Sequence, residues 1–154
     1  MEYLLTKWVH IVSSTLLFGT GLGSAFYMFF ASRTRDPRVV SAVVKYVVIA
    51  DWCFTTPTVI LQPLSGFYMV HLAGYPLTST WLLWSIILFL VAGAAWLPVV
   101  WMQIQMRRMA QSSAASGAAL PELYWKYLRG WVALGIVAFV ALVIVFYLMV
   151  LKPA

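Results

Sequence analysis

The chain has 154 residues, of which 64% are hydrophobic and only 9% are charged. In soluble domains about a quarter of the residues are charged, so this composition excludes an ordinary water-soluble protein. It indicates an integral membrane protein with one domain. The formal net charge of +6 comes mainly from short loops, which argues against a nucleic-acid-binding surface, and the single cysteine excludes an internal disulfide.

Four apolar stretches are long enough to cross a bilayer, since a helix needs about 20 apolar residues to span the hydrocarbon core. They cover residues 7–31, 47–72, 81–104 and 131–151. We therefore expect an all-α fold, a four-helix bundle within the membrane. The first stretch continues without a break into a basic loop, so we expect it to be an uncleaved span and not a signal peptide.

Eight of the ten lysines and arginines lie in or next to two of the three connections. They are Arg33, Arg35, Arg38 and Lys45 after the first span, and Arg107, Arg108, Lys126 and Arg129 around the stretch QSSAASGAA, which we expect to be flexible. Positive residues favour the cytoplasmic side, so we predict that both connections lie there and that both termini face the periplasm. The expected location is the inner membrane of a bacterium, as a multi-pass protein.

The second span contains polar and helix-disturbing residues. Pro57 and Pro63 predict a kink or loosened backbone over Thr56–Pro63. Asp51 lies near the start of this span, where we expect it to pair with Lys45 or with a basic residue of the third connection. Gln62 lies beside Pro63 and is expected to satisfy a backbone group that the proline leaves free.

The only two histidines, His10 and His71, fall near the outer ends of the first and second spans. An ionisable side chain inside a span is costly and by default indicates a functional site. Neutral imidazole is a good ligand for haem iron, and helix bundles hold cofactors between facing helices. The pair predicts a b-type haem with His10 and His71 as axial metal ligands. The alternative is that each is an interfacial histidine bonded to water or to a carbonyl group.

Three further residues of the first span are candidates for the same cofactor site. Lys7 lies one turn before His10 on the same face, where its ammonium group could meet a propionate. Ser14 lies one turn after His10, and Gly21 is the middle residue of a glycine run. This run favours close helix packing, within the bundle or in a homo-oligomer, although small residues also leave room for a flat macrocycle.

The chain resembles a bacterial family of predicted integral membrane proteins without an assigned function, over the stretches KWVHIVSSTLLFGTGLG, DWCFTTPTVILQPLSGFYMVHLAGYPL, WLPVVWMQIQMR and YWKYLRGWVALGIVAFVALVIVFYLMVLKP. It is similar, more distantly, to the HemJ-type protoporphyrinogen oxidases, which are membrane haem proteins. The matching residues are Lys7 and His10 in the first span, Thr56, Pro57 and Gly66 in the second, and Lys152 and Pro153 at the end. This resemblance implies that His10 takes part in haem binding. HemJ proteins have an essential lysine early in the third span, whereas this chain has Ser85, which argues against porphyrinogen oxidation by the HemJ route.

Three functions remain open from the sequence. The first is a haem b protein that transfers electrons near the periplasmic face, with a quinone or a redox partner protein. The second is a HemJ-like protoporphyrinogen IX oxidase of haem biosynthesis. The third is a cofactor-free structural or accessory subunit of a larger complex. A hydrolase is disfavoured because the chain has only four acidic residues and no convincing Ser-His-Asp set.

Overall fold

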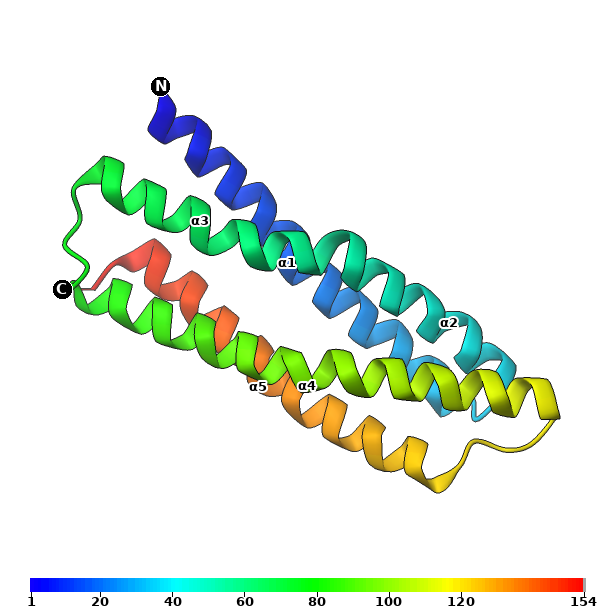
Figure 1. Ribbon diagram of the computed structural model, residues 1–154. Coiled ribbons are helices and arrows are strands. Elements are labelled where there is room, and N and C mark those ends of the chain that lie inside the picture. The colour runs from blue at the N-terminus through cyan, green and yellow to red at the C-terminus, as the bar shows by residue number, and fades with distance from the viewer. Residues whose placement is uncertain (154) are drawn as a thin grey trace.

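The computed structural model describes residues 1–153. In this part of the chain every regular element is helical, which confirms the all-α class and the four-helix bundle. The elements, shown in Figure 1, are α1 (Glu2–Arg33), α2 (Pro37–Ala50), the π-helical turn η1 (Asp51–Thr55), α3 (Thr56–Ala73), α4 (Thr80–Ser116) and α5 (Glu122–Leu151). Because α2, η1 and α3 follow one another without a break, they act as one 37-residue helix.

The surface of the bundle is suited to lipid. Four helices are long and apolar enough to cross a membrane. Large apolar side chains along their middle parts are exposed, among them Leu64 at 63%, Leu90 at 64% and Leu97 at 65%. An apolar surface of this extent is unfavourable in water and is the surface that lipid chains cover. The chain is therefore a multi-pass membrane protein.

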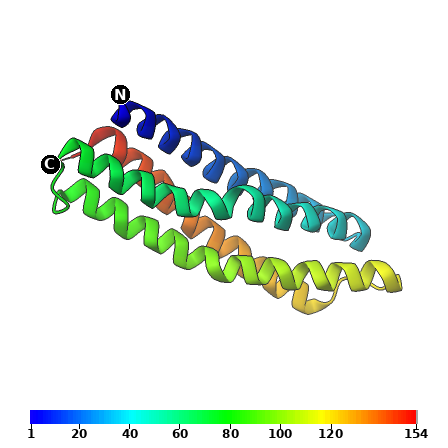
Figure 2. The same ribbon diagram turned by 45° about the horizontal axis from the view of Figure 1, so that its top comes forward.

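The three connections between the membrane helices lie at the two ends of the bundle (Figures 1 and 2). The α1–α2 and α4–α5 connections lie at one end, and both termini lie at the other with the α3–α4 connection. The first of these ends carries the eight clustered lysines and arginines, and we call it the basic end. The prediction that both basic connections share one side is thus confirmed.

The helices extend beyond the predicted spans at the basic end. Asp36 caps α2, since its Oδ1 accepts a hydrogen bond of 2.9 Å from the Arg38 backbone N–H, and Pro37 occupies the first helical position. Helix α4 continues to Ser116 and ends at Gly117, which has a φ of 70°. The expectation of a flexible QSSAASGAA stretch was wrong over Gln111–Ser116. Its alanines and serines tolerate a helix, and the glycine is the first residue suited to end it.

The predicted loosening of the second span is present, one turn earlier than expected. Pro57 has no N–H to donate to the carbonyl group one turn before it, and its ring crowds that carbonyl. The backbone widens there into the π turn η1, in which the Thr56 N–H donates to the Asp51 carbonyl oxygen. Such π turns in α-helices are frequent at functional sites.

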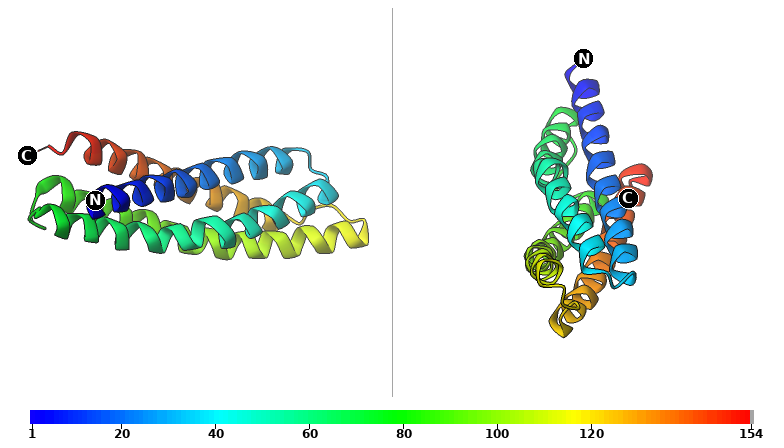
Figure 3. Two further views of the ribbon diagram at one scale, coloured as in Figure 1. Left: turned by 90° about the horizontal axis from the view of Figure 1, so that it is seen from above. Right: turned by 90° about the vertical axis from the view of Figure 1, so that its right-hand side faces the viewer.

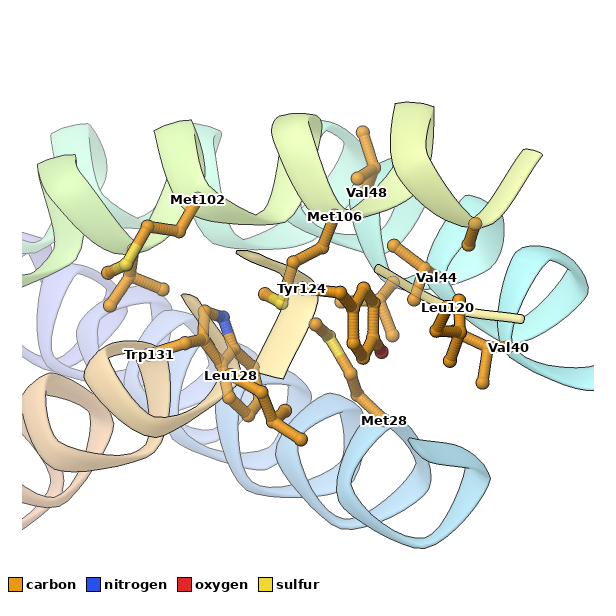
Figure 4. Packing of buried hydrophobic residues seen from close by; sticks show 13 residues of the cluster. Met28, Val40, Val44, Val48, Met102, Met106, Leu120, Tyr124, Leu128 and Trp131 are labelled. Atoms are coloured by element: carbon orange, nitrogen blue, oxygen red, sulfur yellow. The ribbon is translucent and has the colours of Figure 1, made fainter. Parts of the chain in front are cut away.

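The best-packed part of the bundle lies at the basic end. Helix α4 packs along α5, α1 packs against α3, and α2 packs against both α1 and α4 (Figure 3). The main core joins α1, α2, α4 and α5 and includes the fully buried Met28, Val44, Met106 and Tyr124 (Figure 4). The hydroxyl group of Tyr124 also forms a 2.7 Å hydrogen bond with Ser32. This core holds the helices together next to the polar site described below.

Candidate functional site

Four buried polar side chains form a continuous chain of hydrogen bonds between η1, α4 and α5. The Gln103 Nε2 donates to Asp51 Oδ2 at 2.6 Å, and the Thr55 hydroxyl donates to Asp51 Oδ1 at 2.8 Å. The Trp131 Nε1 donates to Gln103 Oε1 at 2.8 Å. Asp51 and Trp131 are each 6% exposed and Gln103 is 2% exposed. We call Asp51, Thr55, Gln103 and Trp131 the Asp51 network.

The partners of Asp51 differ from those predicted. An ion pair with Lys45 or with another basic residue was expected, but the carboxyl group contacts an amide and a hydroxyl. The Lys45 ammonium instead lies 5.7 Å from the centroid of the Tyr46 ring. The two residues are six positions apart along the helix, which is a rotation of about 240° around its axis. Lys45 is therefore exposed while Asp51 points into the bundle. The prediction of an ion pair was wrong for this reason.

A cavity of about 390 Å³ lies beside the Asp51 network. All four long helices contribute to its walls, and the network residues lie at the part nearest the basic end. The apolar part of the wall includes Leu17, Leu22 and Phe29 of α1, Val59 of α3, Phe89 and Val99 of α4, and Ile136, Phe139 and Leu142 of α5. On α4 the lining runs from Phe89 to Gln103, a length of about 21 Å. The site is therefore a long apolar space with a polar group of side chains at one end.

Glycines create part of this space. Gly21, Gly93 and Gly135 line the cavity, one from each of α1, α4 and α5. In the described part of the chain, a Cβ added to any of them would have no atom within 4 Å. Gly19 and Gly23 have equally open surroundings. The prediction that this glycine run mediates close helix packing within the bundle was wrong, since no neighbouring helix approaches it. Gly21 instead leaves volume open.

The cavity wall also contains a polar group without a partner. Trp96 lines the cavity, and its buried Nε1 forms no hydrogen bond within residues 1–153. A buried donor without an acceptor costs about 1–3 kcal/mol.

His10 lies in the contact between α1 and α3. Its Nδ1 shares a 2.7 Å hydrogen bond with the Ser65 hydroxyl, and its backbone oxygen accepts a 2.9 Å hydrogen bond from Gln62 Nε2. Gly66 makes room for the imidazole, because a Cβ on this glycine would lie 3.4 Å from the His10 Cε1. Gln62 does satisfy a backbone carbonyl, but this is the His10 carbonyl and not one freed by Pro63. The bond at Nδ1 leaves Nε2 as the ring nitrogen available to a metal.

His71 lies on a different face of α3 and at a different height. It is exposed, and it follows Gly66 by five residues, which is about 7.5 Å along the helix and about 140° around it. The structure therefore does not bring His71 next to His10. Two axial ligands must face each other across one iron, so this arrangement does not fit a haem held by both histidines.

The remaining predicted cofactor residues lie apart from one another. Lys7 is exposed, and the Ser14 hydroxyl donates to the Ile11 carbonyl of its own helix at 2.8 Å. Gly21 lines the cavity, away from His10. Within residues 1–153, no group of three or more histidine, cysteine, aspartate or glutamate side chains is placed to hold a metal ion.

Comparison with known proteins identifies the family. A family model described as "Predicted integral membrane protein (DUF2269)" matches residues 4–153. The chain belongs to this family. The match includes all four membrane helices, the Asp51 network and His10, and it confirms the resemblance to a family of predicted integral membrane proteins. No curated protein and no solved structure matches the chain.

The Asp51 network was not recognised from the sequence. Gln103 and Asp51 both stand in apolar stretches, and each lies a similar number of residues from the basic connections. The two residues therefore lie at a similar depth in neighbouring spans, and this pattern could have identified Asp51 and Gln103 as partners. The same reasoning was applied to the histidines, where it did not identify the contact that the structure shows.

Proposed function

We propose that this protein binds a membrane-soluble amphiphile, with an apolar body and an uncharged hydrogen-bonding head, in the cavity between its four helices. The observation that carries the proposal is the combination of a long apolar cavity with the Asp51 network at one end. Small-molecule sites are typically apolar spaces in which a few polar groups fix the orientation of the ligand. The head is expected near Asp51 and the body along Gly21, Gly93 and Gly135.

A membrane quinone is the class of ligand that fits these features. Its ring carries carbonyl acceptors, and its isoprenoid tail is apolar. The Gln103 amide has a second N–H besides the one that bonds Asp51, and this N–H is a donor for such a carbonyl group. An uncharged head is favoured because a charged group would lose its hydration inside the bundle. Since quinones carry electrons, this proposal retains the redox role expected from the sequence.

The test uses two glycine variants on one helix. Gly21→Leu places a side chain in the cavity, whereas Gly19→Leu makes the same change two residues away, outside the cavity lining and equally without a close neighbour in the described residues. Each protein is extracted from its native membrane in mild detergent, and the bound lipid-soluble compounds are measured by mass spectrometry. We expect the wild type and Gly19→Leu to retain one compound, a quinone, in near-equimolar amount, and Gly21→Leu to lose most of it.

The outcomes separate the parts of the proposal. Retention of a different uncharged amphiphile, again lost only in Gly21→Leu, would correct the quinone assignment and keep the site. Equal retention in both variants, or no retained compound in the wild type, would contradict binding in the cavity.

A second candidate is a b-type haem with His10 as its protein ligand. It is supported by the His10–Ser65 hydrogen bond, because histidine ligands commonly have their second ring nitrogen held in this way. The distant resemblance to HemJ proteins favours the same residue. When bound, a haem supplies one-electron redox chemistry. Ser65 would orient the imidazole, and Gly66 would leave it room.

The visible spectrum of the purified protein tests this candidate. We expect a Soret band that is lost in His10→Ala and retained in His71→Ala, since only His10 is held in a suitable position. The absence of a Soret band from wild-type protein supplied with haem during expression would rule the candidate out.

A further inference from the structure

A second pocket lies at the basic end, between the α1–α2 connection and the first turns of α5. Its volume is about 490 Å³. The residues that border it are Arg35, Ala119, Leu120, Glu122, Trp125, Leu128 and Arg129. It shares no residue with the cavity beside the Asp51 network.

Two arginines from separate parts of the chain approach this pocket. Glu122, Trp125 and Arg129 follow one another on α5 at spacings of three and four residues, which places them on one face of the helix. Arg35 comes from the α1–α2 connection, and its guanidinium lies 5.8 Å from the centroid of the Trp125 ring. The indole ring thus holds the Arg35 side chain on the face of α5 that also carries Arg129.

The backbone at Arg35 is unusual. Its φ of 57° lies in the left-handed region, which is unfavourable for a residue with a side chain. A glycine or an asparagine would adopt this turn more easily. Arg35 directly follows Thr34, the C-cap of α1, and a left-handed residue at this position is a common way for a helix to end. This turn directs the chain away from α1 at the edge of the pocket that Arg35 borders.

We propose that this pocket binds a phosphate group that carries a hydroxylated substituent, as in the headgroup of an anionic phospholipid. Guanidinium groups recognise phosphate through paired, charge-assisted hydrogen bonds. The pocket has two positive side chains and one negative side chain, Glu122. The carboxylate is an acceptor for the hydroxyl groups of a glycerol headgroup, so a phosphate with such a group fits better than a bare phosphate.

The position of the pocket agrees with this ligand. Tryptophan is typical of the membrane–water interface, the depth at which lipid phosphates lie. Basic pockets at the ends of membrane helices are a known type of site for anionic headgroups. The proposal is independent of the cavity ligand, because it rests on other residues at another depth.

The experiment measures binding to the full chain in an uncharged detergent by isothermal titration. The probes are dihexanoyl-phosphatidylglycerol, dihexanoyl-phosphatidylcholine and inorganic phosphate. The pocket variant is Arg35→Gln/Arg129→Gln. The matched control is Arg33→Gln/Arg108→Gln, which removes two exposed positive charges from the same end without touching the pocket lining.

We expect phosphatidylglycerol to bind to the wild type and to the control, and to bind at least about tenfold more weakly to the pocket variant. Phosphatidylcholine is expected to bind more weakly than phosphatidylglycerol to the wild type. Competition by inorganic phosphate at equal concentration would assign the site to soluble phosphate compounds, whereas failure to compete assigns it to a lipid headgroup.

Two results would overturn the proposal. One is equal binding of phosphatidylglycerol and phosphatidylcholine to the wild type. The other is an equal loss of affinity in the pocket variant and the control, which would reflect only the general charge of the basic end. Because Arg129 is exposed, the single variant Arg129→Gln provides the same comparison if the double variant does not fold.

Discussion

Replacement of Gln103 by leucine tests whether the Asp51 network holds three helices together. Leucine is close in size to glutamine, so the change removes hydrogen bonds with little change in volume. It leaves the Asp51 Oδ2 and the Trp131 Nε1, both now bonded to Gln103, without that partner inside the bundle. Each buried polar group left without a partner costs about 1–3 kcal/mol, so two such groups would lower the free energy of unfolding by about 2–6 kcal/mol. Hydrogen bonds between membrane helices, however, contribute only about 0.6 kcal/mol each on average. We expect Gln103→Leu to lower the free energy of unfolding by about 2 kcal/mol.

The assay is unfolding by sodium dodecyl sulfate in mixed micelles, followed by circular dichroism. Gln105→Leu is the matched control, because this glutamine lies two residues along the same helix and is only partly buried. Trp131→Phe removes the indole donor and also leaves unfilled volume, because Trp131 is buried in the main core, so it is expected to lower the stability through both effects. If Gln103→Leu and Gln105→Leu have the same stability, the network does not stabilise the bundle and the reasoning is refuted.

Three further predictions concern contacts outside the network, each measured by the same unfolding assay. Ser65→Ala removes the partner of the His10 Nδ1 and should lower the free energy of unfolding by about 1 kcal/mol. Ser14→Ala removes a bond within one helix and should lower it less, so equal effects would contradict a role of Ser65 in joining α1 to α3. Tyr124→Phe should cost about 1 kcal/mol by breaking a 2.7 Å bond to α1, and an unchanged stability would contradict this. Gly117→Ala should cost about 1 kcal/mol because the φ there is 70°, and a stabilising effect would show that α4 does not end in this conformation.

The membrane helices could be predicted from the sequence because length and hydropathy alone decide them. The position of the basic end followed equally directly from the lysines and arginines. The helix bounds were less accurate, since α4 runs to Ser116 through residues that are polar but tolerate a helix. Composition identifies where a helix can leave the bilayer, and a residue such as Gly117 decides where the helix stops.

The candidate site could not be derived in the same way because it depends on how each helix is rotated about its axis. Helix α4 is apolar on most sides, so its sequence does not show which side faces the bundle interior. The burial of Gln103, which is greater than that of Gln105, could therefore not be predicted. The same limitation affected the histidines. Both were correctly placed towards the same end of the bundle, but the rotation of α3 brings Ser65, and not His71, to His10. The open surroundings of Gly21 are likewise a property of the assembled bundle.

The most direct test of the central claim is an electron-density map of crystals grown from protein that was extracted from its native membrane. The account predicts elongated density in the cavity, passing Gly21 and Gly135 and ending within hydrogen-bonding distance of Asp51 or Gln103. A cavity filled by its own side chains, with Phe29 and Phe139 closing the space and no density beside the Asp51 network, would contradict it.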